Sequence, residues 1–458
     1  MSAVEIRTPR RRTGLVLLVI GLLVGFAAYA DAGLARRGHV PGNLALYVAL
    51  LGGGFAVAFL VQRAVAPHAD PVFLPVAALL STLGFAIIFR LVRPTPTGSL
   101  SAEQATWLLI GLGAFVLTLV LVRDDRQLDG YTYTIGLVGL VLLLLPIVPG
   151  IGQTINGARL WVGVGPVSFQ PSEFGKILIV IFLASYLESK RELLATGVGR
   201  LGLPRVKDLG PLLLAWGTSL AILFMEKDLG ASLLYFGVFV VMLWVATGRP
   251  AYLVIGLLMF AAGAVVGYLL LTHVQVRVDY WLHALEPKHV YGIGYGQIAQ
   301  GQFALASGGL VGTGLGQGSP TLIPYAATDF IFAAIGEELG MLGTAGVLLL
   351  YLVIVDRGLR LALERTDGFG KLLAAGLTTS IAVQTFVIVG GVTRLIPLTG
   401  ITLPFVSYGG SSLVSNFVLI ALLVRVSSGP WERRPRRERP EKPKPESEAA
   451  ADVVPEAT

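Results

Sequence analysis

The chain contains no cysteine and few charged residues. The missing cysteines exclude disulfides, thiolate catalysis and cysteine-ligated metal sites. Charged residues make up only 14% of the sequence, against about a quarter in an ordinary soluble domain, whereas 54% of the residues are hydrophobic. The catalytic patterns HExxH, GxSxG, SxxK and Walker A are also absent, which removes the metalloprotease, hydrolase, penicillin-binding and nucleotide-hydrolysing chemistries that use them.

Apolar runs of about 17–25 residues recur along most of the chain, and this length crosses a bilayer as a helix. We therefore predict an all-α polytopic membrane protein with about twelve transmembrane helices. The predicted spans are 14–30, 44–61, 72–91, 105–122, 132–149, 171–187, 209–225, 229–247, 251–271, 329–355, 372–394 and 402–425. The first run is expected to remain as a helix, because no small-residue cleavage site follows it.

Basic connections set the orientation. The segments 123–126, 188–207 and 356–371 are rich in Arg and Lys, and they fall on the same side as the basic stretch 7–12 and the basic tail. That side is predicted to be the cytoplasm, with both termini inside and the protein in the cytoplasmic membrane. The net charge of +7 therefore reports topology, and no nucleic-acid partner is expected. From about residue 427 the chain is rich in Pro, Arg and Glu, which predicts a disordered tail.

Two long polar connections, 150–170 and 272–328, fall on the predicted outer face, so we expect the protein to act there. Asp329 follows the second of them and begins a long helix. As an isolated residue it would be an N-terminal cap by about two to one. Its position at the outer surface favours the alternative, a carboxylate that is shielded from water, has a raised pKa and acts as a general base.

Further ionisable residues lie within or beside the predicted spans. Glu337 and Glu338 are predicted to fix helix packing or to line a cavity, with equal weight. Glu173 and Lys176 are three residues apart, so they share a helix face and can pair. Glu226 and Asp228 lie between two spans, where a charged surface hairpin is the simpler interpretation. In the loop 150–170, Arg159 could hold a phosphate and Trp161 could be an interfacial aromatic.

Four motifs together are similar to one family. The stretches "NGARLW" (156–161), "QPSEFGK" (170–176), "TDFIFAAIGEELG" (328–340) and "LPFVSYGGSS" (403–412) resemble the SEDS proteins of shape, elongation, division and sporulation, which include FtsW, RodA and SpoVE. The resemblance runs from about residue 72 to 426. The approach to Asp329 lacks the lysine of the division type, so the chain looks more like the elongation (RodA) type of high-GC Gram-positive bacteria.

The resemblance implies a ten-helix core over 72–426, an N-terminal addition of two helices over 1–71, and a disordered cytoplasmic tail over 427–458. It places the large extracellular loop before the tenth helix. It implies peptidoglycan glycosyltransferase activity, the polymerisation of lipid II outside the membrane. The family's essential Asp corresponds to Asp329, its loop Trp to Trp161, and its buried Glu and Lys to Glu173 and Lys176. Its signature corresponds to Tyr408, Gly409, Gly410, Ser411 and Ser412.

The implied reaction uses Asp329 as the base that accepts a proton from a sugar hydroxyl. Arg159, Lys176 or a divalent cation (Mg²⁺ or Mn²⁺) would supply positive charge at the leaving pyrophosphate. No metal cluster is readable, and Lys227 stands where the family usually has Pro. The expected partner is a class B penicillin-binding protein within an elongation or division complex. A lipid II flippase and a non-catalytic scaffold are the alternatives.

Overall fold

Long helices run side by side through the part of the chain that the computed structural model describes, which comprises residues 11–91, 100–155, 158–164, 167–195, 217–218, 221, 225–291 and 296–429. Within these residues, nine helices are long and apolar enough to cross a membrane. The predicted polytopic helical fold is confirmed. The predicted span 209–225 lies almost entirely outside the described residues.

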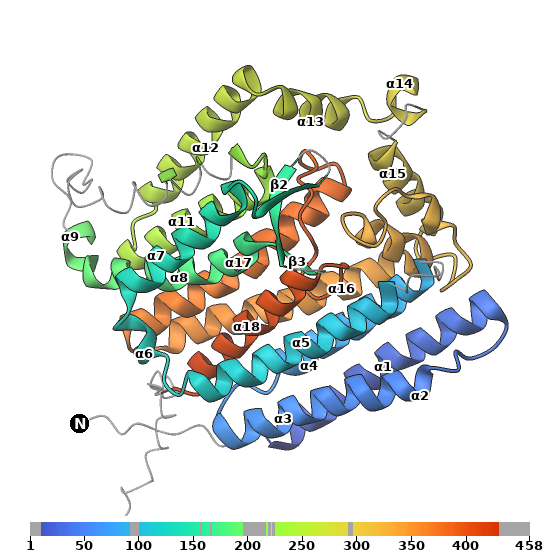
Figure 1. Ribbon diagram of the computed structural model, residues 1–458, viewed down its shortest axis with the longest axis horizontal. Helices are drawn as coiled ribbons and strands as arrows, with labels where there is room; N and C mark the ends of the chain where they lie inside the picture. The colour runs from blue at the N-terminus through green and yellow to red at the C-terminus, as the bar shows by residue number, and fades with distance from the viewer. Residues whose placement is uncertain are drawn as a thin grey trace, which may run out of the picture.

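The N-terminal helices pack on the outside of the remaining bundle. α1 (Arg11–Arg37) lies along α4 (Phe73–Leu91), and the continuous segment of α2 (Leu44–Tyr47), η1 (Val48–Gly52) and α3 (Gly53–Val65) lies along α5 (Leu100–Leu121). These helices form the lower edge of the molecule in Figure 1. Much of their apolar surface stays exposed, as expected for helices that face lipid.

The centre of the bundle is made by three well-buried helices. They are α8 (Pro171–Ser189), α17 (Gly368–Val392) and α18 (Gly410–Ser427). α11 (Leu229–Thr247) and the long α16 (Ile331–Glu364) pack against α17, and α18 packs against α5. α7 (Thr132–Leu144) and η2 (Leu145–Ile147) lie beside α8, whereas α12 (Ala251–Leu270) exposes most of its apolar side chains.

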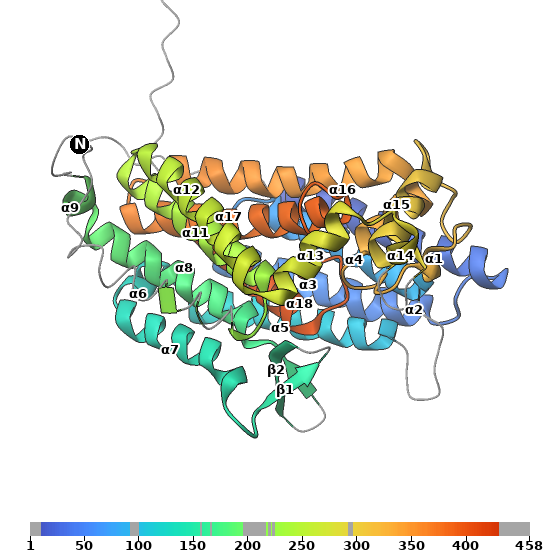
Figure 2. The same ribbon diagram turned by 90° about the horizontal axis from the view of Figure 1, so that it is seen from above.

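The two ends of the bundle differ in structure. Figures 1 and 2 show α6 (Arg126–Asp129) and α9 (Arg191–Ala195) at one end and α14 (Pro287–Val290) and α15 (Gln297–Gly308) at the other. α13 (Thr272–Leu282), α14, α15 and η3 (Pro320–Leu322) occupy most of the long connection before α16. This connection therefore carries its own helices and holds a defined shape.

A small antiparallel sheet is the part of the fold that the all-α prediction missed. β1 (Gly152–Ile155), β2 (Ala158–Val164) and β3 (Val167–Phe169) pair in the order β1-β2-β3, with Gly152 opposite Val162 and Val162 opposite Phe169. In Figure 2 the sheet projects beyond the end of α7. The strands are short, and hydropathy does not separate them from the apolar runs on either side.

The last helix was predicted to begin at 402, but α18 begins at Gly410. The preceding apolar residues form a buried loop, and Leu403, Phe405 and Val406 are almost inaccessible to solvent. This loop packs so closely on α4 that a Cβ at Gly84 would lie 2.4 Å from the carbonyl oxygen of Val406. A buried loop has the composition of a membrane span, which explains the error.

Candidate active site

Asp329 lies in a tight turn directly before α16. The turn is closed by hydrogen bonds from the backbone N–H groups of Thr328 and Phe330 to the carbonyl oxygen of Tyr325, which has a positive φ of 57°. The N-cap position of α16 is Phe330, and no side chain caps the helix. The capping interpretation of Asp329 is therefore wrong, and its half-buried carboxyl group is free for another role.

The loop before α18 fixes this turn from the other side. Ser407 donates a 2.6 Å hydrogen bond from its hydroxyl to the carbonyl oxygen of Thr328, and the N–H of Tyr408 donates to Ala327. Gly400 comes so close that a Cβ there would lie 3.7 Å from Oδ2 of Asp329. Residues far apart in the sequence thus fix the position of the Asp329 carboxyl group.

Two charged residues from other segments stand next to Asp329. Burial raises the pKa of Asp329 to about 6, against smaller lowering effects of a hydrogen bond from Thr328 and the charge of Arg277. Asp228 interacts with the same arginine, and burial raises its pKa as well. Arg277 lies on α13 and donates hydrogen bonds to the carbonyl oxygens of Leu398 (3.2 Å) and Thr399 (2.7 Å). Arg277 thus interacts electrostatically with two carboxylates from other segments.

Asp228 caps α11 by accepting a 2.8 Å hydrogen bond from the N–H of Ala231. Glu226 is buried beside it, and burial and the neighbouring carboxylate raise its pKa to about 8. Lys227 between them has a φ of 64°, a value that the proline ring cannot adopt. The hairpin predicted here is a buried acidic turn, with a local geometry that proline at this position would not allow.

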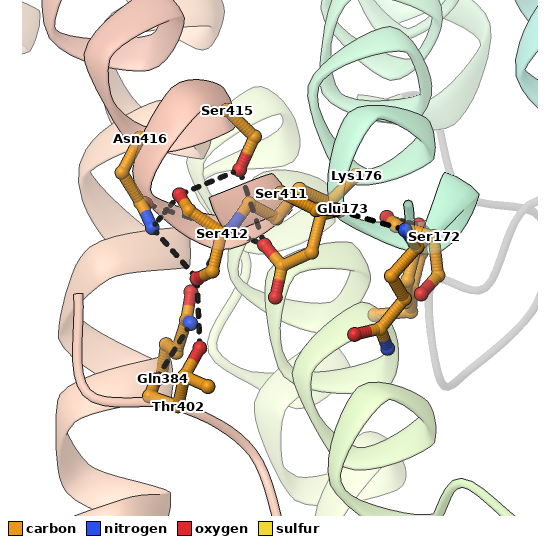
Figure 3. Close-up of polar contacts among 11 residues, drawn as sticks. Ser172, Glu173, Lys176, Gln384, Thr402, Ser411, Ser412, Ser415 and Asn416 are labelled. Carbon is orange, nitrogen blue, oxygen red and sulfur yellow. Dashed lines mark hydrogen bonds and ion pairs between the residues drawn. The ribbon is translucent and has the colours of Figure 1, made fainter. Parts of the chain in front are cut away.

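Glu173 and Lys176 form the predicted pair, with Nζ of Lys176 2.6 Å from Oε2 of Glu173. Lys176 also donates to Gln384 (3.0 Å) and Asn416 (3.4 Å), while Ser415 donates to Glu173 (3.1 Å). Figure 3 shows these side chains meeting from α8, α17 and α18. Because all three ammonium protons have protein partners, the pair links the central helices and leaves no donor for a phosphate.

Glu337 and Glu338 anchor the glycine-rich loop that precedes Asp329. Oε1 of Glu337 accepts a 2.7 Å hydrogen bond from the N–H of Ser319. Oε1 of Glu338 lies 3.0 Å from Nε of Arg90, and Arg90 also donates to the carbonyl oxygens of Gly316 and Gly318. Of the two predicted roles, packing is the one that this geometry supports.

Arg159 and Trp161 lie on β2. Arg159 donates to the carbonyl oxygen of Val148 at 3.3 Å, at the base of the sheet. Trp161 is partly buried opposite Gln153. Among the described residues, no hydrogen bond or ion pair joins either side chain to Asp329. The structure thus places both in the predicted loop but not in the carboxylate cluster.

The glycines and hydroxyl groups of the signature 408–412 make the contacts that connect the start of α18 to neighbouring segments. Tyr408 donates to Glu103 at 2.5 Å. Ser411 accepts a 2.9 Å hydrogen bond from the N–H of Gln170. A Cβ at Gly410 would lie 2.3 Å from the ring of Trp107, whereas the extended φ of Gly409 is open to any residue. These contacts assign the signature a structural role in holding the loop that fixes Asp329.

Arg277 is the residue that the sequence analysis missed. A single arginine in a long polar connection gives no signal until the fold places it beside Asp228 and Asp329. The signal that could have pointed to it is an arginine four positions before Trp281 on an 11-residue helix. Across the described residues, no group of three or more His, Asp or Glu could hold a metal ion.

Comparison with known proteins identifies the family. The model of the FtsW, RodA and SpoVE cell cycle proteins matches residues 71–430. The chain belongs to this family. It is 45% identical to the peptidoglycan glycosyltransferase RodA of Mycobacterium tuberculosis, over 97% of this chain and 96% of that protein. It is 37% identical to the stage V sporulation protein E of Bacillus subtilis, over 70% of this chain and 85% of that protein.

Solved structures agree with this assignment. A chain of a peptidoglycan synthase complex, described as coordinating polymerisation and crosslinking, superposes with a TM-score of 0.63 at 28% identity, covering 78% of this chain and 97% of that one. The RodA of Thermus thermophilus gives a TM-score of 0.55 at 28% identity, covering 78% and 96%. The predictions of the family and of a glycosyltransferase are confirmed by these relatives.

Proposed function

We propose that this protein is the peptidoglycan glycosyltransferase of its cell's elongation machinery and polymerises lipid II at the outer face of the cytoplasmic membrane. The observation that carries the proposal is Asp329. It is a half-buried carboxylate that does not cap α16. Its pKa is raised, and it interacts electrostatically with Arg277. The mycobacterial relatives named RodA match nearly the whole chain, which favours the elongation role over the division role.

In the proposed step, the carboxylate of Asp329 accepts the proton of a sugar hydroxyl on one substrate. The hydroxyl oxygen forms a bond to the anomeric carbon of the other substrate. The bond from that carbon to the pyrophosphate oxygen breaks, and its electron pair leaves with polyprenyl pyrophosphate. Positive charge near the breaking bond stabilises the leaving group. Arg277, which interacts electrostatically with Asp329, can supply this charge. The described residues offer no cluster that would hold a divalent cation.

An apolar cavity of about 490 Å³ supports a lipid-linked substrate. It lies between α5, α8 and α18 and is apolar apart from Ser411, with Trp107, Phe169 and Phe174 among its lining residues. A cavity of this kind suits an isoprenoid chain and offers nothing to a soluble nucleotide sugar. It borders Ser411 of the signature, so a lipid chain here would reach the helices that position Asp329.

The orientation also follows from charge. Arg123, Arg126, Lys190, Arg191 and Arg360 lie near α6 and α9 or at the far end of α16, which we assign to the cytoplasm. The end with α13–α15 and Asp329 is then the outer face, and both termini are cytoplasmic. We assign residues 72–426 as the catalytic core and 1–71 as an accessory segment. Membership of the family and the likeness to a chain of a peptidoglycan synthase complex support a class B penicillin-binding protein as its partner.

The test is an assay of purified protein with its partner on lipid II in vesicles. Glycan polymer from the wild type, and its loss with a folded Asp329→Asn variant, supports the proposal. A flippase predicts the opposite pattern, in which no polymer forms and Asp329→Asn still moves lipid II across the bilayer. A scaffold predicts that cells carrying Asp329→Asn grow normally.

A further inference from the structure

A second cavity opens at the end of the lipid-facing helix α12. It has a volume of about 650 Å³, and its lining includes Lys227, His273 and Arg277 together with Leu270 and Leu271. The three basic residues come from two separate segments, the turn before α11 and the helix α13. Among the described residues that line it, none is a carboxylate, and the polar side chains are basic apart from Thr272.

Two of these basic side chains have unused binding capacity. Nε2 of His273 is buried, and it has no hydrogen-bond partner among the described residues. Lys227 is exposed, and its ammonium group makes no ion pair within the described part of the chain. Lys227 also holds a left-handed backbone conformation, which is strained for a non-glycine residue, and such strain clusters at functional sites. The cavity thus holds a buried imidazole nitrogen and an ammonium group that both lack a partner among the described residues, an arrangement that an anion would complete.

The third basic residue connects the cavity to the carboxylate cluster. Arg277 lines the cavity and also interacts electrostatically with Asp228 and Asp329. An anion in the cavity would therefore sit one side chain away from the proposed base. Only a molecule whose negative charge is close to its reacting atom could bind in this cavity and reach Asp329 at the same time.

The opposite wall of the cavity is apolar and lies at the lipid-facing surface of the bundle. Leu269 and Leu270 at the end of α12 are 65% and 74% exposed, and most of that helix is unburied. The cavity thus joins a lipid-facing surface to a basic wall. This combination fits a phosphorylated lipid headgroup better than a free phosphate, because the hydrocarbon chain would cover exposed leucines.

We propose that Lys227, His273 and Arg277 bind the pyrophosphate of the lipid-linked donor, the group that leaves when its sugar is transferred. The inference rests on the proposed function and deepens it. Lys227 and His273 donate charge-assisted or neutral hydrogen bonds to phosphate oxygens, and the guanidinium of Arg277 adds charge while its N–H groups stay on Leu398 and Thr399. From the sequence, Lys176 or Arg159 was expected to supply positive charge at the leaving pyrophosphate. We assign this role to Lys227, His273 and Arg277 instead.

The experiment measures binding apart from turnover. Full-length protein in phosphatidylcholine nanodiscs is titrated with undecaprenyl pyrophosphate and with uncharged undecaprenol. The variants are Lys227→Ala, His273→Ala and the control Lys288→Ala, which removes one positive charge from the same end of the bundle outside the cavity. We expect about tenfold weaker binding of the pyrophosphate for each cavity variant, unchanged binding for the control, and no difference for undecaprenol.

Unchanged pyrophosphate binding by both cavity variants would overturn the inference. Equal competition by phosphatidylglycerol added to the nanodiscs would also overturn it, because the cavity would then hold any anionic headgroup. Polymerisation is assayed on the same preparations. Polymer formation together with unchanged binding contradicts only this inference, whereas a wild type that binds but makes no polymer contradicts the proposed function.

Discussion

The hydroxyl group of Ser407 donates to the carbonyl oxygen of Thr328 and accepts a hydrogen bond from the N–H of Leu403. One buried side chain therefore closes the loop before α18 and ties it to the residue beside Asp329. The loop in turn rests on α4, where Gly84 leaves room for Val406. The position of the proposed base is thus set by a contact between segments 79 residues apart in the sequence, on a loop that packs against α4.

Replacing Ser407 tests this coupling. Ser407→Ala leaves two buried backbone groups without a partner, so we expect the free energy of unfolding to fall by about 1–3 kcal/mol. Polymerisation should fall with it, because Asp329 loses its fixed position. The control is Ser307→Ala on α15, whose hydroxyl donates to the carbonyl oxygen of Ala304 within its own helix. Thermal unfolding in detergent and lipid II turnover are measured on both, and equal values for the two variants would contradict the coupling.

The pH dependence of polymerisation should show the titration of Asp329. A base must be unprotonated to accept a proton, and the pKa of Asp329 is raised to about 6. The rate constant should therefore be near its plateau above pH 7, half of it near pH 6, and about tenfold lower for each further unit of acidity. Initial rates between pH 5 and 8 in a buffer of constant ionic strength give the curve. A flat profile over this range would argue against Asp329 as the base.

Arg277 should shift the pH profile of polymerisation through its electrostatic effect on the pKa of Asp329. Its positive charge lowers the pKa of Asp329, so Arg277→Met should raise that pKa and move the acid limb to higher pH. A merely structural role would lower the rate without moving the limb. Arg360→Met, at the other end of the bundle and paired with Asp356, serves as the control. An unmoved limb in Arg277→Met would show that the two charges are not coupled.

The sequence was sufficient for the features that depend on composition and local motif. Hydropathy predicted the helical bundle and the motifs predicted the family, and both are confirmed. The motifs also indicated Asp329 as the candidate base, which stays a prediction. The sequence was insufficient for segments whose structure depends on tertiary contacts, such as the loop before Gly410 and the strands β1–β3. Lys176 looked available for a phosphate until Gln384 and Asn416 were placed around it. The importance of Arg277 became apparent only from its electrostatic interaction with Asp228 and Asp329, which lie far from it in the sequence.

The ion pair between Arg90 and Glu338 should matter for stability more than for chemistry. Glu338 is 1% exposed, so Arg90→Met leaves a buried carboxylate without its cation, and we expect a loss of about 3–5 kcal/mol. The double variant Arg90→Met/Glu338→Gln removes the charge as well and should recover part of the loss. Thermal unfolding of the three proteins decides this. A double variant no more stable than Arg90→Met would show that the pair is not responsible.

The most direct test of the account compares Asp329→Asn with the wild type in lipid II polymerisation, using purified protein with its class B penicillin-binding protein. Asp279→Asn is the matched control, because Asp279 is an exposed acid on α13 paired with His283. The account predicts glycan strands from the wild type and from Asp279→Asn, and a rate at least about 100-fold lower from a folded Asp329→Asn protein. A rate from Asp329→Asn equal to that of the wild type would contradict it.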